Sequence, residues 1–179
     1  MDNRIQSCGR RDGRRAAANI GDMNWFRVCG AAVAAVAALT VAPNAAASEA
    51  FVPLSLRYRA CDHTQLGYLG GRGAASVHAL MSWDAATVSA DVEIAVGKPD
   101  TVYRLRLIQV PRPAVGTCNP GDPATVTGTL RTDGNGTGAA SVQGTRSPGA
   151  TGFWVWVDGP RDVSGVPEFY TSDYVTRFG

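Results

Sequence analysis

The chain has 179 residues, of which 45% are hydrophobic, which is enough for one domain with a buried core and short for two. Six of the 17 basic residues precede the apolar run that begins at Val28, so 11 basic and 12 acidic residues remain from Ser48 onward. This near-neutral balance gives no basic field for nucleic acid and no polybasic patch for anionic lipid, so we expect neither partner.

The N-terminal region has the three parts of a secretory signal peptide. Arg27 supplies a positive charge, residues 28–42 form an almost unbroken apolar run, and Ala45 and Ala47 fit the A-x-A pattern of a cleavage site. The apolar run is shorter than the roughly 20 residues that span a bilayer as a helix. We therefore predict a cleavable secretion signal over residues 23–47, with no membrane attachment after cleavage.

Residues 1–22 are polar, rich in arginine, and followed by a second methionine, Met23. They are interpreted as a disordered lead or a mis-assigned start, with translation beginning at Met1 or at Met23. The remaining residues, 48–179, are near the usual size of one domain. The predicted organisation is therefore a lead, a secretion signal and a single exported domain.

The cysteines predict one disulfide bond. Cleavage of the signal would remove Cys8 and Cys29 and leave Cys61 and Cys118. An even number of cysteines in an exported chain is typical of a disulfide, and neither remaining cysteine belongs to a C-x-x-C pair. We therefore interpret Cys61 and Cys118 as a structural disulfide and not as a thiol catalyst.

Apolar and polar residues alternate with a period of two in several segments, which is typical of half-buried strands. The eight segments are 51–60, 75–83, 87–96, 101–110, 124–132, 138–145, 151–158 and 167–177. In 101–110, for example, Tyr103, Leu105 and Leu107 lie on one face and Arg104 and Arg106 on the other. Turn-forming residues separate the segments, and none of them has the 3.6-residue period of a helix.

About eight short strands without helices predict an all-β fold. We expect a two-sheet antiparallel sandwich, immunoglobulin-like or a related Greek key, preceded by the signal peptide. The glycine-rich residues 67–73 are predicted to form a loop between the first two strands.

The segment 132–138, TDGNGTG, can be interpreted as a hairpin turn or as part of a calcium loop. Asp133, Asn135 and Thr137 carry side-chain oxygens at calcium-loop spacing, but Gly144 stands where the loop needs a bidentate glutamate. Asp-Gly and Asn-Gly between alternating strands favour a hairpin, because glycine and asparagine tolerate positive φ. We therefore predict a hairpin turn and no metal site.

Trp154 and Trp156 form a possible ligand platform. In 151–158 the apolar residues Phe153, Val155 and Val157 share one face and the two tryptophans share the other. Exposed indoles on that face would suit the stacking of sugar rings. Exposed aromatic patches are uncommon on monomers, and a terminal segment such as 169–178 could fold over the strand, so we predict that at least one indole is mostly buried and that the strand is structural. Core positions in the same scheme are Val52, Val92, Leu105, Leu130 and Val155.

The sequence contains no recognisable catalytic motif. His63 and His78 are its only histidines, too few for a copper-zinc site, and it has no G-x-S-x-G nucleophile motif. We expect no cofactor and no enzyme activity.

The alanine-rich signal, residues 59–62 and 116–119 around the two cysteines, and the run 127–136 resemble small exported β-sandwich proteins of actinobacteria, mycobacteria included, a group of uncharacterised function. The resemblance implies the fold and a secreted or cell-envelope location, and it supplies no active-site residue. We expect a non-catalytic exported domain that binds an unidentified protein or glycan at the cell envelope. The alternatives are a carbohydrate-binding module that uses Trp154 and Trp156, and an unrecognised secreted hydrolase.

Overall fold

The structure, a computed structural model, describes residues 47–161, 163 and 165–179. The predicted lead and almost all of the predicted secretion signal lie outside these residues. The described chain is all-β, and no helix in it is long and apolar enough to cross a membrane. The strands are β1 (Ser48–Ser55), β2 (Arg57–Arg59), β3 (Gln65–Gly70), β4 (Ser76–Trp83), β5 (Thr87–Ala95), β6 (Val102–Val110), β7 (Thr125–Arg131), β8 (Gly138–Thr145), β9 (Gly152–Asp158), β10 (Phe169–Ser172) and β11 (Thr176–Arg177).

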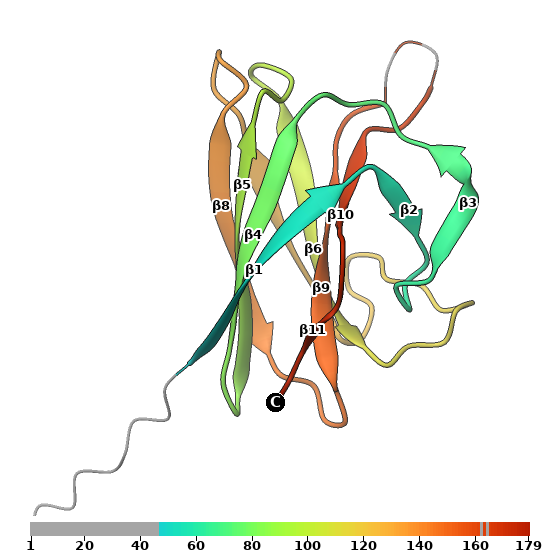
Figure 1. The fold of residues 1–179 in the computed structure, drawn as a ribbon, viewed down its shortest axis with the longest axis vertical. Helices are drawn as coiled ribbons and strands as arrows, with labels where there is room; N and C mark the ends of the chain where they lie inside the picture. The colour runs from blue at the N-terminus through green and yellow to red at the C-terminus, as the bar shows by residue number, and fades with distance from the viewer. Residues whose placement is uncertain (1–46, 162, 164) are drawn as a thin grey trace, which may run out of the picture. The chain divides into compact units, whose positions relative to one another are not determined.

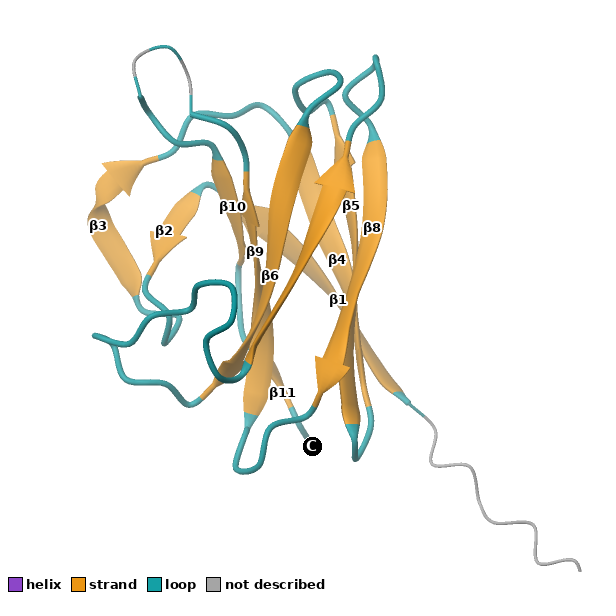
Figure 2. Ribbon diagram, turned by 180° about the vertical axis from the view of Figure 1, so that it is seen from behind, coloured by secondary structure: helices purple, strands orange, loops and turns teal. Residues whose placement is uncertain are grey.

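One antiparallel sheet contains most of these strands. Its order is β7-β6-β9-β10-β1-β4-β5-β8, with β11 paired to β9, and it curls into a nearly closed barrel (Figures 1 and 2). The predicted all-β antiparallel class is confirmed, but the expected two-sheet sandwich is wrong. The sheet is continuous because β1 pairs with β10 on one side and with β4 on the other. Strand β1 thus joins the β7-β6-β9-β10 half to the β4-β5-β8 half, which a sandwich would keep as two sheets.

The two ends of the sheet meet at a seam between β7 and β8. These strands lie beside one another but form no backbone ladder, since β7 pairs with β6 and β8 pairs with β5. The seam is packed by side chains instead. The Val126 side chain of β7 lies so close to Gly144 of β8 that a Cβ atom at position 144 would be only 2.3 Å from Val126 Cγ2. The predicted turn between these strands is present, but the strands that it joins do not pair as a hairpin.

The turn itself is fixed by the carboxylate of Asp133. Its Oδ1 accepts hydrogen bonds from the backbone N–H groups of Asn135 (2.8 Å) and Thr137 (2.9 Å), which lower the pKa of Asp133. Gly136 has φ +76°, and a Cβ there would lie 2.1 Å from Gly97 O. The segment that resembled a calcium loop therefore uses its first oxygen ligand to hold its own backbone.

Three of the predicted segments differ from the observed strands. Segment 51–60 is divided into β1 and β2, and segment 167–177 into β10 and β11. The predicted loop 67–73 overlaps β3, which pairs with β2 in a separate two-stranded sheet. This β2–β3 hairpin lies to one side of the barrel (Figure 1).

Alternation along the strands sends one set of apolar side chains into the barrel. The predicted core positions Val52, Val92, Leu105, Leu130 and Val155 are all fully buried there. Together with their buried neighbours they form a single continuous core, as the period of two requires.

Polar side chains close each end of this core. Near one end of β6, buried Glu168 accepts hydrogen bonds from the hydroxyls of Tyr103 (3.0 Å) and Tyr170 (2.9 Å) and pairs with Lys98, the only lysine of the chain. Near the other end of β6, the side-chain amide of Gln109 donates a hydrogen bond to the backbone carbonyl of Thr145. Its Oε1 accepts a hydrogen bond from the backbone N–H of Ser147. The buried side chains of Glu168 and Gln109 thus have polar partners, which reduces the cost of burying them.

Candidate functional site

Trp154 and Trp156 lie in a second apolar cluster on the outside of the barrel. Their side chains are 0% and 6% exposed, so the prediction that at least one indole is buried is confirmed. The sugar-stacking platform requires both indoles at the surface, and neither is there. Buried members of the cluster are Ile108, Val110, Cys118, Trp154, Trp156 and Phe169, with Tyr58, Cys61 and Val175 packed against them.

The cover over these indoles comes from three segments. The terminal segment 169–178 contributes Phe169 and Val175, and Tyr58 of β2 packs edge-on against Trp156, with ring centroids 5.3 Å apart. The β2–β3 hairpin and the long loop 111–124 between β6 and β7 lie next to each other beside the barrel in both views (Figures 1 and 2).

The predicted disulfide joins these two covering segments. Cys61 follows β2 and Cys118 lies in the loop 111–124, with their Cα atoms 5.7 Å apart. The bond therefore ties the hairpin to the loop over the outer cluster. A disulfide of this kind is typical of proteins from oxidising compartments outside the cytosol.

Neither histidine is hydrogen-bonded to a serine hydroxyl in the described chain. His63 Nε2 donates to the backbone carbonyl of Ser172 (2.9 Å), and burial lowers the pKa of this histidine. The hydroxyl of Ser172 is buried and bonds to the backbone of Val155 instead. His78 pairs with Glu93 on the exposed face of β4 and β5, at 3.1 Å, and has no hydrogen bond to a serine in the described chain.

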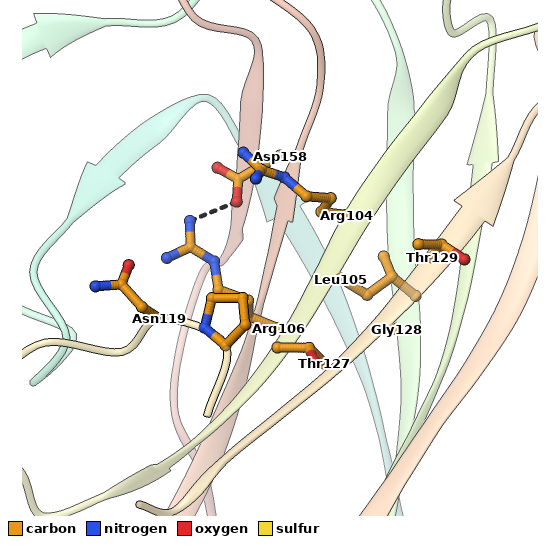
Figure 3. A pocket seen from close by; sticks show the side chains of 9 residues that line it. Arg104, Leu105, Arg106, Asn119, Thr127, Gly128, Thr129 and Asp158 are labelled. Atoms are coloured by element: carbon orange, nitrogen blue, oxygen red, sulfur yellow. Dashed lines mark hydrogen bonds and ion pairs between the residues drawn. The ribbon is translucent and has the colours of Figure 1, made fainter. Parts of the chain in front are cut away.

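A cleft of about 380 Å³ lies on the outer face of β6 and β7, where the loop 111–124 approaches the sheet. Figure 3 shows its lining side chains, with Arg104 and Arg106 rising from β6 and Thr127 and Thr129 from β7. The lining residues are Arg104, Leu105, Arg106, Asn119, Pro120, Thr127, Gly128, Thr129 and Asp158. Register explains the grouping, because Arg104 pairs with Thr129 and Arg106 with Thr127 across the antiparallel ladder.

Arg106 is held rigidly at the floor of the cleft. Its Nη2 donates to Asp158 Oδ2 at 2.5 Å, and its Nη1 donates to Cys118 O at 3.3 Å (Figure 3). Its guanidinium carbon also lies 4.0 Å from the ring centroid of Trp156, in cation–π contact. Asp158 therefore balances the charge of Arg106, and the buried indole supports its position.

Arg104 differs from Arg106, although the two stand two residues apart on the same strand. Its side chain is exposed, and it has no ion pair or hydrogen bond within the described chain. Among the described residues, Asp158 is the only carboxylate that lines the cleft. Because that carboxylate is paired with Arg106, the cleft carries one positive charge without a partner.

Asn119 and Pro120 form the wall of the cleft opposite the sheet. Asn119 directly follows the disulfide residue Cys118, and its N–H donates to Asp122 Oδ2 at 2.7 Å. Hydrogen bonds from the Thr117 hydroxyl and this N–H lower the pKa of Asp122. The disulfide and the turn together fix the backbone that carries this wall.

The sequence alone predicts only part of the lining of this cleft. The alternation in 101–110 places Arg104 and Arg106 on the outer face of a strand, but outward-facing arginines are common in half-buried strands. Asn119 and Asp158 come to the same place only through the pairing of β6 with β9 and the path of a long loop. No spacing in the sequence predicts that convergence.

Among the described residues, no three His, Cys, Asp or Glu side chains are grouped so that they could hold a metal ion. The chain was compared with protein-family models, curated proteins and solved structures, and none of the three comparisons found a match.

Proposed function

We propose that this chain is an exported, non-catalytic binding domain and that its ligand binds in the cleft between β6, β7 and the loop 111–124. The observation that carries the proposal is the state of the two arginines. Arg106 is fixed by Asp158 and Trp156, whereas Arg104 is exposed and unpaired beside it. A cavity with a few convergent polar groups on a rigid scaffold is the usual form of a small-molecule site.

Two further features support an exported binding role. The disulfide suits an oxidising compartment and fixes the wall of the cleft that carries Asn119. Among the described residues that line the cleft there is no histidine, cysteine or serine, and the one carboxylate, Asp158, is paired with Arg106, so no unpaired nucleophile or base of the usual hydrolase type stands in this lining. A glycan or an exposed segment of an envelope protein is the expected class of partner.

The proposal is tested by following the backbone amide resonances of the oxidised, ¹⁵N-labelled protein while neutral, anionic and cationic small molecules and oligosaccharides are added. We expect shifts that cluster on β6, β7 and residues 117–122, and we expect each bound compound to remain chemically unchanged in the same tube. Arg104→Ala should remove the shifts, and Arg131→Ala, a matched exposed arginine on β7 outside the cleft, should leave them.

Shifts that cluster on another face, or shifts that survive Arg104→Ala, would contradict the proposed site. Turnover of a bound compound would contradict the non-catalytic role.

A further inference from the structure

We infer that the cleft binds a saccharide that carries an anionic group, either a carboxylate or a phosphate. The inference rests on the binding function proposed above and names its ligand class. It is carried by three properties of the described cleft: its charge, the hydrogen-bonding capacity of its other side chains, and its extent.

The charge of the cleft favours a negative group on the ligand. Asp158 neutralises Arg106, and no second carboxylate of the described chain lines the cleft to neutralise Arg104. A guanidinium binds a carboxylate or a phosphate through two parallel N–H donors, and such charge-assisted bonds are stronger than neutral ones. An anionic group bound at Arg104 would leave the existing Arg106–Asp158 pair intact.

The remaining polar side chains suit hydroxyl groups. The hydroxyls of Thr127 and Thr129 and the carboxamide of Asn119 make no hydrogen bond within the described chain. Each of them can both donate and accept, as a sugar hydroxyl does, whereas a bare inorganic anion needs donors alone. The ring of Pro120 and the threonine methyl groups add apolar surface for the C–H groups of a sugar.

The extent of the cleft indicates more than one sugar unit. A second cavity of about 280 Å³ shares Arg106 and Asn119 with the first and continues past Tyr58 and Leu66. The two cavities therefore share a border at Arg106 and Asn119, and a chain of sugars that passes over this border would extend from Arg104 toward the disulfide.

The experiment uses the oxidised protein and four probes, which are glucuronic acid, glucose 6-phosphate, glucose and inorganic phosphate, each titrated while amide shifts are recorded. We expect at least one of the two sugar anions to shift the amides of β6 and β7. Glucose and inorganic phosphate should bind roughly tenfold or more weakly, because each lacks one half of the recognised chemistry.

The variants separate a specific contact from a general effect of charge. Arg104→Gln should weaken binding of the sugar anions about tenfold, since it removes one charge-assisted bond. Arg131→Gln changes the net charge equally and should leave the dissociation constant within about twofold, because its charge is exposed and screened. A disaccharide that ends in glucuronic acid should bind more tightly than the monosaccharide and should also shift the amides near Tyr58.

Each other result overturns a stated part of the inference. If glucose binds in the cleft as tightly as glucuronic acid, the inference that the ligand needs an anionic group is wrong, while the proposal that the cleft is a binding site is supported. If inorganic phosphate binds as tightly as glucose 6-phosphate, the inference that the cleft recognises the sugar part of the ligand is wrong. No shift on β6 and β7 with any of the four probes would refute the ligand class, and the wider screen described above would then decide separately whether the cleft binds a ligand.

Discussion

Removal of the Cys61–Cys118 disulfide should lower the stability of the domain by several kcal/mol. The bond closes a loop of 57 residues, and the loss of chain entropy in the unfolded state then stabilises the fold by about 4 kcal/mol in the loop-closure model. A domain of this size is stable by only about 5–15 kcal/mol in total. The double variant Cys61→Ala/Cys118→Ala should therefore unfold at much lower urea concentration than the oxidised protein.

The assay is equilibrium urea unfolding followed by tryptophan fluorescence, which is sensitive to the two buried indoles next to the disulfide. The slope of the free energy against urea should rise in the double variant, since its unfolded chain is no longer cross-linked and exposes more surface. A reducing agent should shift the midpoint of the parent protein toward that of the variant and should have no effect on the variant, which serves as the control. If the double variant does not fold, the parent protein with and without reductant still gives the comparison.

Unfolding free energies that agree within about 0.5 kcal/mol for the parent protein and the double variant would refute the argument, because ordinary surface substitutions with no structural role have effects of that size. Two free thiols in the oxidised, folded protein would refute it directly.

Three further predictions concern the barrel and the cluster on its outer face. Trp154→Ala should cost about 3–5 kcal/mol of unfolding free energy because the indole is fully buried, whereas Phe51→Ala, at 59% exposure, should cost much less in the same urea assay. Gly136→Val should cost about 1–3 kcal/mol because φ is +76°, and Gly134→Val, with open space around it, should be nearly neutral, so equal effects would contradict the turn geometry. Burial raises the pKa of Tyr103 to about 12, above its unfolded value of about 10, so its contribution to stability is complete below pH 10 and is lost as the pH rises toward 12. Tyr103→Phe should therefore make the unfolding midpoint fall less steeply with pH in that window, and an unchanged slope would count against it.

The local features were predictable because short-range physics sets them. The alternation in 87–96 and 101–110 predicted β5 and β6 to within one residue at each end, since side chains on a strand must point to opposite faces. The same parity placed Val155 inside the barrel and Trp154 on the opposite face. The cysteine pair was also predictable, because cleavage of a signal would leave only Cys61 and Cys118 to pair.

The sequence by itself thus determined the all-β class, the core faces of the strands, the disulfide and the 132–138 turn. Only the tertiary structure decided that β1 joins β10 to β4 in one sheet, because strand order depends on pairings between segments far apart in the chain, which alternation does not encode. The cleft was decided in the same way. In the sequence, Arg104 is an ordinary outward-facing arginine. The pairing of β6 with β9 brings Asp158 to Arg106, and the disulfide fixes the loop that carries Asn119 to the same cleft. A site of this kind is a convergence of side chains in space, which no pattern along the chain encodes.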